Sequence, residues 1–456
     1  MLGLFIATVI TIITGYFIIK KYKPQPVLMI AGLLMMLIAA YVVGKPLLVG
    51  KASTNLYTFD AVKFMSQLFS TRTAGLGMII MSAGGFAKYM DHIGASKTLV
   101  NLCTKPLQMV KSPYVVLALA YIIGQILNIF IPSASGLGML LMVTIFPILT
   151  SLGVSRLSAA AVICSCSGLD LGPASGNSNL AAKNAGLDPA IYFAEYQIPL
   201  AIVVVLITAA LHLVVQRYFD KKDAALLAEQ EAAYEAKADN GEAAPFIFAF
   251  LPMLPLALIL IFSKLFIASI KMDVVTAMLI SLLVSMGFQL VRTGDLKAVL
   301  KSMQVFFDGM GSQFAAVITL IVAGEVFAKG LTSLGAINKL IDMAHNTGMA
   351  GLGMTIVMTA IIVVCSIVMG SANAPFFAFA ALVPQVATKI GMSPVIMLLP
   401  MQFASGLARN LSPITGVVVA VCGLAGVNPM DLMKRTYIPM SISIVITVIA
   451  TVMIFH

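Results

Sequence analysis

The sequence predicts an all-α integral membrane protein made of two related halves. Of its 456 residues, 60% are hydrophobic and only 10% are charged, less than half the charged share of a soluble domain. Apolar runs close to the ~20 residues that cross a bilayer follow one another along most of the chain. These observations exclude a soluble enzyme, a secreted disulfide scaffold and a disordered chain as descriptions of the whole.

The net charge of +10 does not indicate a nucleic-acid partner. The Lys and Arg residues stand singly between apolar runs, as charges that orient membrane helices do. Most of the five cysteines lie in apolar stretches and are interpreted as small core residues. No zinc spacing, phosphate loop or nucleophile elbow is present, so we expect no enzyme and no cofactor other than a coupling ion.

The first repeat is expected over residues 1–216. Two of its apolar runs are interrupted by small and polar residues, which predicts a hairpin over about 114–152 and a broken helix over about 157–190. The interruptions are expected at 132–138 and at 172–179. The expected uninterrupted spans are 2–19, 27–43, 74–90 and 196–216.

A charged, Ala/Glu-rich stretch over 217–244 is interpreted as a polar cytoplasmic linker. The second repeat follows over 245–456, with a hairpin over about 355–390 broken at 370–375 and a broken helix over about 395–423 broken at 407–413. Its uninterrupted spans are expected at 246–263, 274–291, 313–328 and 437–455. The stretches 59–71 and 296–307 mix apolar and charged residues and predict interfacial helices beside the membrane.

Several motifs recur at an offset near 240 residues. Phe86-Ala87-Lys88 matches Phe327-Ala328-Lys329, and the Gly-x-x-Pro of 186–189 matches that of 426–429. If the first broken run of each half is a re-entrant hairpin, each half crosses five times, about ten in all. An odd number gives an inverted-topology repeat. The distribution of basic residues favours both termini on the outer face.

The four interruptions are where chemistry is expected. Irregular backbone at membrane depth persists only inside protein or beside a polar cavity. Gly and Pro permit the unwinding, Ser and Asn offer hydroxyl and amide groups, and half-helix N-termini suit carboxylates. The alternative is that the interruptions are kinks satisfied by neighbouring helices. Their matching places in both halves favour a binding site.

Arg409 is the outstanding charge inside the predicted spans, and it needs an anionic partner. Asp170 precedes the matching interruption of the first half and is placed near Arg409 by the repeat. We predict that the Arg409 guanidinium binds a substrate carboxylate, with a purely structural Asp170–Arg409 pair as the alternative. Glu325 and Lys329 are spaced as a local ion pair, and a proton relay is the second interpretation.

Several longer motifs are distributed over the two halves: Gly75-Leu-Gly-Met78 with Gly85-Phe86-Ala87, Ser112-Pro113-Tyr114, Ser135-Gly136-Leu137-Gly138, Asn373-Ala374-Pro375-Phe376, Leu411-Ser412-Pro413 and Lys434-Arg435-Thr436. Through these motifs the sequence resembles a known family, the anaerobic C4-dicarboxylate carriers of the DcuC type, over nearly its whole length. This family belongs to a larger superfamily with the divalent-anion/sodium symporters.

The resemblance implies scaffold and transport domains, two re-entrant hairpins, elevator-type movement, a homodimer and a place in the bacterial inner membrane. It implies fumarate, succinate, malate or aspartate as substrate. Another organic anion, a tricarboxylate or an acylated amino acid, is the alternative. The symporters carry Ser-Asn-Thr at their hairpin tips, whereas here the tips read Ser-Ala-Ser-Gly and Ser-Ala-Asn-Ala. Coupling to Na⁺, coupling to H⁺ and plain exchange all stay open.

The candidate site follows from the interruptions and the resemblance together. Coupling-ion or proton candidates are Asp170 and Glu325, and a sodium ion is considered near Ser133, Asn177, Asn373 and Ser412. The predicted substrate-binding residues are Ser133, Ala134, Ser135, Gly136, Ser175, Asn177, Ser371, Asn373, Ala374, Arg409, Asn410 and Ser412.

Overall fold

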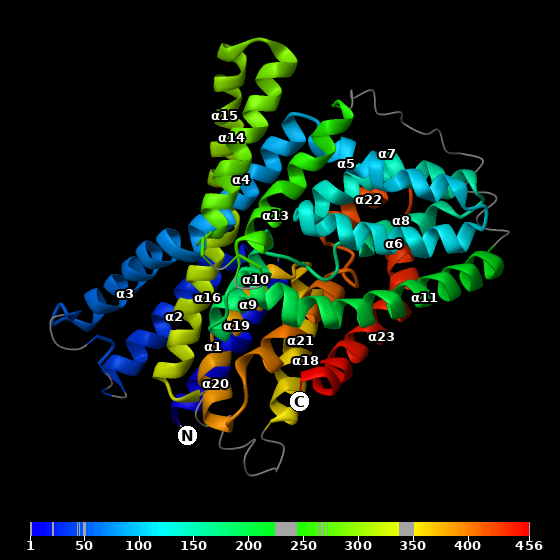
Figure 1. Ribbon diagram of the computed structural model, residues 1–456. Helices are drawn as coiled ribbons and strands as arrows, with labels where there is room; N and C mark the ends of the chain where they lie inside the picture. The colour runs from blue at the N-terminus through cyan, green and yellow to red at the C-terminus, as the bar shows by residue number, and fades with distance from the viewer. Residues whose placement is uncertain are drawn as a thin grey trace.

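The computed structural model describes residues 2–223, 244–336 and 351–455, apart from 21, 43, 45, 49–51, 264, 265, 268 and 271. These residues form helices and contain no strand, as predicted (Figure 1). The first half comprises α1 (Leu2–Ile19), α2 (Pro24–Tyr41), α3 (Tyr57–Arg72), η2 (Thr73–Gly77), α4 (Met78–His92), α5 (Ala95–Thr104), η3 (Lys105–Met109), α6 (Pro113–Phe130), α7 (Ala134–Ser151), α8 (Arg156–Ser165), α9 (Gly176–Ala185), α10 (Pro189–Ile191), η4 (Tyr192–Gln197) and α11 (Ile198–Lys222).

The second half repeats much of this order. It comprises η5 (Phe246–Met253), α13 (Leu254–Ile261), α14 (Val274–Thr293), α15 (Leu296–Gln313), η6 (Phe314–Ile318), α16 (Thr319–Ser333), α18 (Leu352–Met369), α19 (Asn373–Ala380), α20 (Val383–Ile390), α21 (Pro394–Arg409), α22 (Gly416–Ala425) and α23 (Pro429–Phe455).

Within the described ranges, eight helical segments are long and apolar enough to cross a membrane. Both arms of the first predicted hairpin, α6 and α7, are among them at 18 residues each. Length alone therefore does not decide whether this hairpin crosses or re-enters. Four shorter apolar segments include α8 and α22, the parts of the two broken helices.

A π-helical turn marks the repeat most clearly. Of three π-helical turns in the described residues, one begins at Thr73 between α3 and α4 and another at Phe314 between α15 and α16, which is 314 − 73 = 241 residues later. In both places the turn joins a predicted interfacial helix to a span in one continuous helix. The third, η4, has no π-helical counterpart in the described part of the second half. Short π segments are rare and are often found near functional sites. The two halves thus share the order of helix, π-helical turn and helix at this place.

Helix caps determine where the two interruptions of the first half end. The bounds of both interruptions differ from the predicted ones. The hairpin interruption is shorter than 132–138, because the Ser133 hydroxyl accepts from the Gly136 amide and α7 already begins at Ala134. The second interruption occupies 166–175 instead of 172–179. Ser175 caps α9 by accepting from the Ser178 amide, so the helix resumes at Gly176.

The interruptions of the second half are also displaced. Residues 370–372 separate α18 from α19, a shorter gap than 370–375. The last interruption lies at 410–415 instead of 407–413, so that Arg409 ends α21. The predicted linker over 217–244 is partly helix, because α11 continues to Lys222. The remainder of that linker, residues 224–243, lies outside the described residues.

Two groups of helices place the interruptions side by side. Figure 1 shows α6, α7 and α8 next to α22, and buried apolar side chains of these helices form one cluster. A second cluster joins α1, α2 and α16 to α18, α19 and α21. A third apolar cluster is formed where α15 packs along α4. Buried side chains of α13 and α14 belong to the same cluster.

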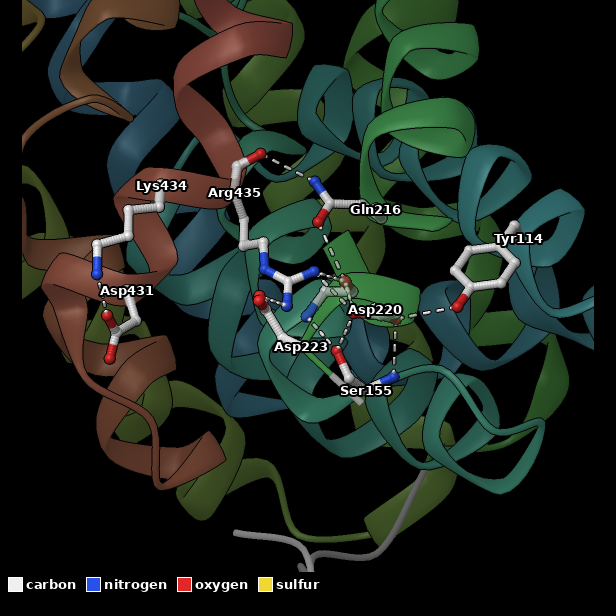
Figure 2. A network of polar contacts seen from close by, with 9 residues as sticks. Tyr114, Ser155, Gln216, Asp220, Asp223, Asp431, Lys434 and Arg435 are labelled. Carbon is white, nitrogen blue, oxygen red and sulfur yellow. Dashed lines mark hydrogen bonds and ion pairs between the residues drawn. The ribbon is translucent and has the colours of Figure 1, made fainter. Parts of the chain in front are cut away.

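A buried ionic network holds the last helix to the first repeat (Figure 2). Arg435 of α23 is 1% exposed. Its Nη1 donates to Asp220 Oδ1 at 2.8 Å and its Nη2 to Asp223 Oδ2 at 2.9 Å. The Asp220 carboxylate also accepts from the hydroxyls of Tyr114 and Ser155. This cluster therefore fastens the ends of α6, α8, α11 and α23 together.

We predict that Asp220→Ala destabilises the protein strongly, by about 3–5 kcal/mol, because it leaves much of the Arg435 charge buried without its partner. Thermal unfolding of the detergent-purified protein measures the effect. Asp431→Ala is the control, since it removes an exposed partner of Lys434 on the same helix (Figure 2) and should leave the melting temperature unchanged. Equal losses in the two variants would contradict a stabilising role of the network.

Candidate binding site at the helix interruptions

The two broken helices cross at their interruptions. Gly406 of α21 packs directly on the carbonyl of Gly168 in the interruption at 166–175, where a Cβ on Gly406 would overlap that carbonyl. Glycine permits this close approach because it has no side chain. The crossing brings together parts of the chain that are more than 200 residues apart.

Side chains of neighbouring helices form hydrogen bonds with backbone amide and carbonyl groups of the non-helical segment at 166–175. Gln402 donates to the carbonyl of Asp170 at 3.0 Å, and its own side-chain oxygen accepts from Tyr192 and Gln197. The amide of Gly172 donates to the Gln197 side chain at 3.0 Å. Asp170 itself has φ 50°, a left-handed conformation that few residues other than glycine adopt. Such strained residues cluster at functional sites.

Asp170 and Arg409 meet, as the repeat predicts. Arg409 Nη2 lies 3.4 Å from Asp170 Oδ1 and also donates to the carbonyl and the hydroxyl of Ser167. The other carboxylate oxygen, Oδ2, accepts from Asn177 at 2.9 Å. Within the described part of the chain, Arg409 Nε is buried without a hydrogen-bond partner. The guanidinium is therefore only partly engaged by the protein.

A cavity of about 570 Å³ opens beside this pair. Three helices point their N-termini at it: α7 with Ala134, α9 with Gly176 and α19 with Asn373. Helix N-termini carry partial positive charge and free amide groups. Together with the Arg409 guanidinium, they place hydrogen-bond donors and partial positive charge on one wall of the cavity, beside the Asp170 carboxylate. The predicted residues that line the cavity are Ser133, Ala134, Ser135, Asp170, Ser175, Asn177, Asn373 and Arg409.

The remaining predicted residues lie around the cavity without lining it. The Gly136 amide donates to the Ser133 hydroxyl and stabilises the start of α7. The Ala374 amide donates to the Ser371 hydroxyl in the same way at the start of α19. Asn410 and Ser412 are fully buried. The Asn410 Oδ1 and Ser412 Oγ atoms have no hydrogen-bond partner among the described residues.

Glu325 does not pair with Lys329, so that prediction is wrong. Its carboxylate forms a two-point ion pair with Arg72, with Nε at 2.6 Å and Nη2 at 2.8 Å. The ammonium group of Lys329 lies instead over the ring of Phe64, 5.6 Å from its centroid. The π-helical turn after Arg72 brings α3 and α16 together, and local spacing on α16 does not reveal that contact.

The residues of the opposite wall of the cavity are not among those predicted from the sequence. It is formed by the α4 face that carries Gly84, Ala87, Lys88 and Asp91, and by the end of α15 near Gln313. The α4 positions follow one helical stripe, i, i+3, i+4 and i+7. They stand in ordinary helix without an interruption. Only the recurrence of Phe86-Ala87-Lys88 in the second half pointed to this stripe.

A helical membrane protein with a polar cavity at crossed helix interruptions has the architecture of a membrane transporter. The family model described as "C4-dicarboxylate anaerobic carrier", DcuC, matches residues 2–456. The chain therefore belongs to the DcuC family of carriers and is a multi-pass membrane protein, not an enzyme.

Relatives of known name agree with this family, and a solved structure shares the fold. A Vibrio cholerae serotype O1 protein named "Probable anaerobic C4-dicarboxylate transporter DcuC" is 36% identical over 458 residues, 100% of this chain and 98% of that protein. The Escherichia coli K12 anaerobic C4-dicarboxylate transporter DcuC is 36% identical over 451 residues, covering 98% and 96%. The crystal structure of the Alcanivorax borkumensis YdaH transporter is similar in fold, with a TM-score of 0.60, 14% identity and coverage of 94% and 97%.

We predict that Gly406→Ala separates the two broken helices, because its new methyl group has no space beside Gly168. Overpacking of this kind costs roughly 1–3 kcal/mol and would also displace Arg409, so both the melting temperature and ligand binding should fall. The control is Gly423→Ala on α22, where no atom lies within 4 Å of the added carbon. A Gly406→Ala protein as stable and active as the control would refute the close crossing.

Proposed function

We propose that the protein carries C4-dicarboxylates (fumarate, succinate, malate or aspartate) across the membrane by alternating access to this cavity. The observation that supports it best is the partly engaged Arg409 guanidinium facing a cavity with three helix N-termini. The guanidinium fork matches a carboxylate in two-point geometry. A volume of about 570 Å³ lies within the range of small-molecule sites.

A dicarboxylate has two negative ends, and the cavity offers two places for them. In this proposal one carboxylate binds Arg409, near the Asp170 contact. The other accepts hydrogen bonds from amide and hydroxyl groups at the start of α7, around Ser133–Ser135, or from Asn373 at the start of α19. Both places lie in the same cavity, so one molecule is able to use both.

Counterflow in proteoliposomes tests this function. Vesicles preloaded with unlabelled succinate should accumulate labelled succinate transiently, and the rate should saturate with concentration. A panel with fumarate, malate, aspartate, citrate and an acylated amino acid identifies the substrate class. Preference for citrate or the acylated amino acid would select the alternative organic-anion carrier. Flux without saturation or counterflow would indicate a channel and reject the proposal.

The coupling ion is part of the same proposal. Asn177 Oδ1, Asn410 Oδ1 and Ser412 Oγ are buried oxygens without hydrogen-bond donors among the described residues, and oxygen ligands of this kind suit a hard cation such as Na⁺. The Asp170 carboxylate is the candidate for a proton. Imposed gradients of Na⁺ or H⁺ in the same vesicles separate these two cases, and counterflow that responds to neither gradient indicates exchange.

We also propose the architecture that the family resemblance implies. The repeats are inverted, the pairs α6–α7 and α18–α20 are re-entrant hairpins, and the interrupted segments move as an elevator against a scaffold within a homodimer. The matched π-helical turns support the repeat. In the bacterial inner membrane both termini are placed in the periplasm. An impermeant thiol reagent that labels a cysteine at position 239, outside the described residues, from outside intact cells would reject this orientation.

We predict that Arg409→Gln lowers succinate affinity at least tenfold, because loss of a buried charged partner costs on the order of 2–5 kcal/mol. Arg409→Lys keeps the charge but loses the planar fork, so its affinity should also fall, though less. Isothermal titration with purified protein measures both values. Thermal unfolding of the same samples checks that the variants are folded.

The double variant Asp170→Asn with Arg409→Gln separates binding from charge balance. If Arg409 holds substrate, the double variant folds and reaches the membrane but does not bind succinate. If Arg409 only neutralises Asp170, the double variant removes both charges together and regains binding. Succinate affinity close to that of the unmodified protein would therefore reject the substrate role of Arg409.

A further inference from the structure

The wall of the cavity on α4 has a counterpart in the second half. Adding 241 to the α4 positions Gly84, Ala87 and Lys88 gives Glu325, Ala328 and Lys329 on α16. The same offset relates Arg72, at the end of α3, to Gln313, at the end of α15. Each π-helical turn follows directly. The structure therefore contains two equivalent walls, one in each repeat.

These two walls are in opposite states. On the first wall, Gln313 packs against Gly84, Ala87 is half-buried and the cavity is open. On the second wall, Ala328 is 5% exposed, and the positions of Gln313 and Gly84 are taken by the Arg72–Glu325 ion pair. The same helix arrangement thus lines a cavity in one repeat, whereas in the other α19 packs on α16 at Gly324 and the ion pair lies on the same helix.

A third basic residue approaches the closed wall. The ammonium group of Lys183 lies 3.5 Å from where a Cβ on Gly75 would be, just after Arg72 in η2. Lys183 is near the C-terminal end of α9, whose first residues, Gly176 and Asn177, line the open cavity. At 1.5 Å per residue, α9 connects the two places over about 10 Å.

We propose that the closed wall is a second vestibule of the transport path, a receiving site for a dicarboxylate dianion that the Arg72–Glu325 ion pair holds shut. The proposal rests on the dicarboxylate function proposed above. Arg72, Lys183 and Lys329 bring three positive charges and Glu325 one negative charge, so the net charge is 3 − 1 = +2. This charge complements the two carboxylates of the substrate.

The ion pair suits the role of a gate because it competes with the substrate for the same group. Arg72 Nη2 donates to one oxygen of the Glu325 carboxylate and Nε lies 2.6 Å from the other, so the guanidinium is turned toward one carboxylate as it would be toward that of a substrate. When the pair separates, Arg72 presents its fork to the vestibule. The Gly84–Gln313 contact at the equivalent positions of the first wall, which is open, involves no ion pair.

A matched pair of cysteines tests the gate. Ala87→Cys reports the open wall and Ala328→Cys reports the closed one, in a protein whose two partly exposed cysteines, Cys103 and Cys365, are replaced by serine. An impermeant thiol reagent should label position 87 quickly and position 328 slowly. Glu325→Gln should raise the labelling rate of position 328 about tenfold, the change that a shift of about 1.4 kcal/mol gives.

Two further variants make the outcome decisive. Arg72→Gln should raise labelling at position 328 as Glu325→Gln does, whereas the control Asp308→Asn, on the exposed face of α15, should not. Succinate should slow labelling of position 328 in Glu325→Gln but not when Arg72→Gln is added, since the receiving group is then absent. Unchanged labelling of position 328 in both charge variants would overturn the gate.

Labelling also separates this proposal from the substrate assignment. The rates at positions 87 and 328 require no substrate, so a gate that opens in Glu325→Gln is recognised even if counterflow shows no dicarboxylate transport. Failure of succinate to protect position 328, while succinate still binds the unmodified protein, would overturn the receiving role of Arg72. Titration of succinate into the purified protein provides that comparison.

Discussion

The contact between Asp170 and Arg409 is the constraint on which the transport region depends. A guanidinium inside an apolar helical protein is expensive to bury without an anion and hydrogen-bond acceptors. Arg409 ends α21, whereas its acceptors, Asp170 and Ser167, lie in the interruption between α8 and α9. Neither broken helix therefore contains the partner of its own charged residue. Each depends on the broken helix of the other half to supply that partner.

The same crossing explains how irregular backbone persists at this depth. Unpaired amide and carbonyl groups are not tolerated in lipid, and here Gln402 and Gln197 supply their partners. If the interruptions were only kinks, all of their buried polar groups would have hydrogen-bond partners within the protein. This is not the case, because Arg409 Nε has no partner among the described residues and the starts of α7 and α19 face a cavity. In the function proposed above, the substrate binds beside Arg409 and at the helix starts that face this cavity.

The sequence predicted those features that depend on composition and on the repeat. The span 2–19 could be recognised from its apolar run, and Asp170 and Arg409 from two isolated charges at nearly equivalent positions. The ends of the interruptions could not be placed, because single hydroxyl caps such as Ser133 and Ser175 move a helix start by several residues. The partner of Glu325 was missed because Arg72 is 253 residues away, and only tertiary packing brings them together.

The two halves have a similar helix arrangement, but their charged residues differ at equivalent positions. At equivalent positions the first repeat has Gly84 beside Gln313, and the second has Glu325 beside Arg72. In the gate proposed above, the two walls open at different free-energy cost, because only the second must separate an ion pair. In a two-state carrier each 1.4 kcal/mol of such a difference changes the ratio of the states tenfold. Under that proposal the resting orientation of the carrier is set by side chains on the walls, while the similar helix arrangement of the two halves supplies both orientations.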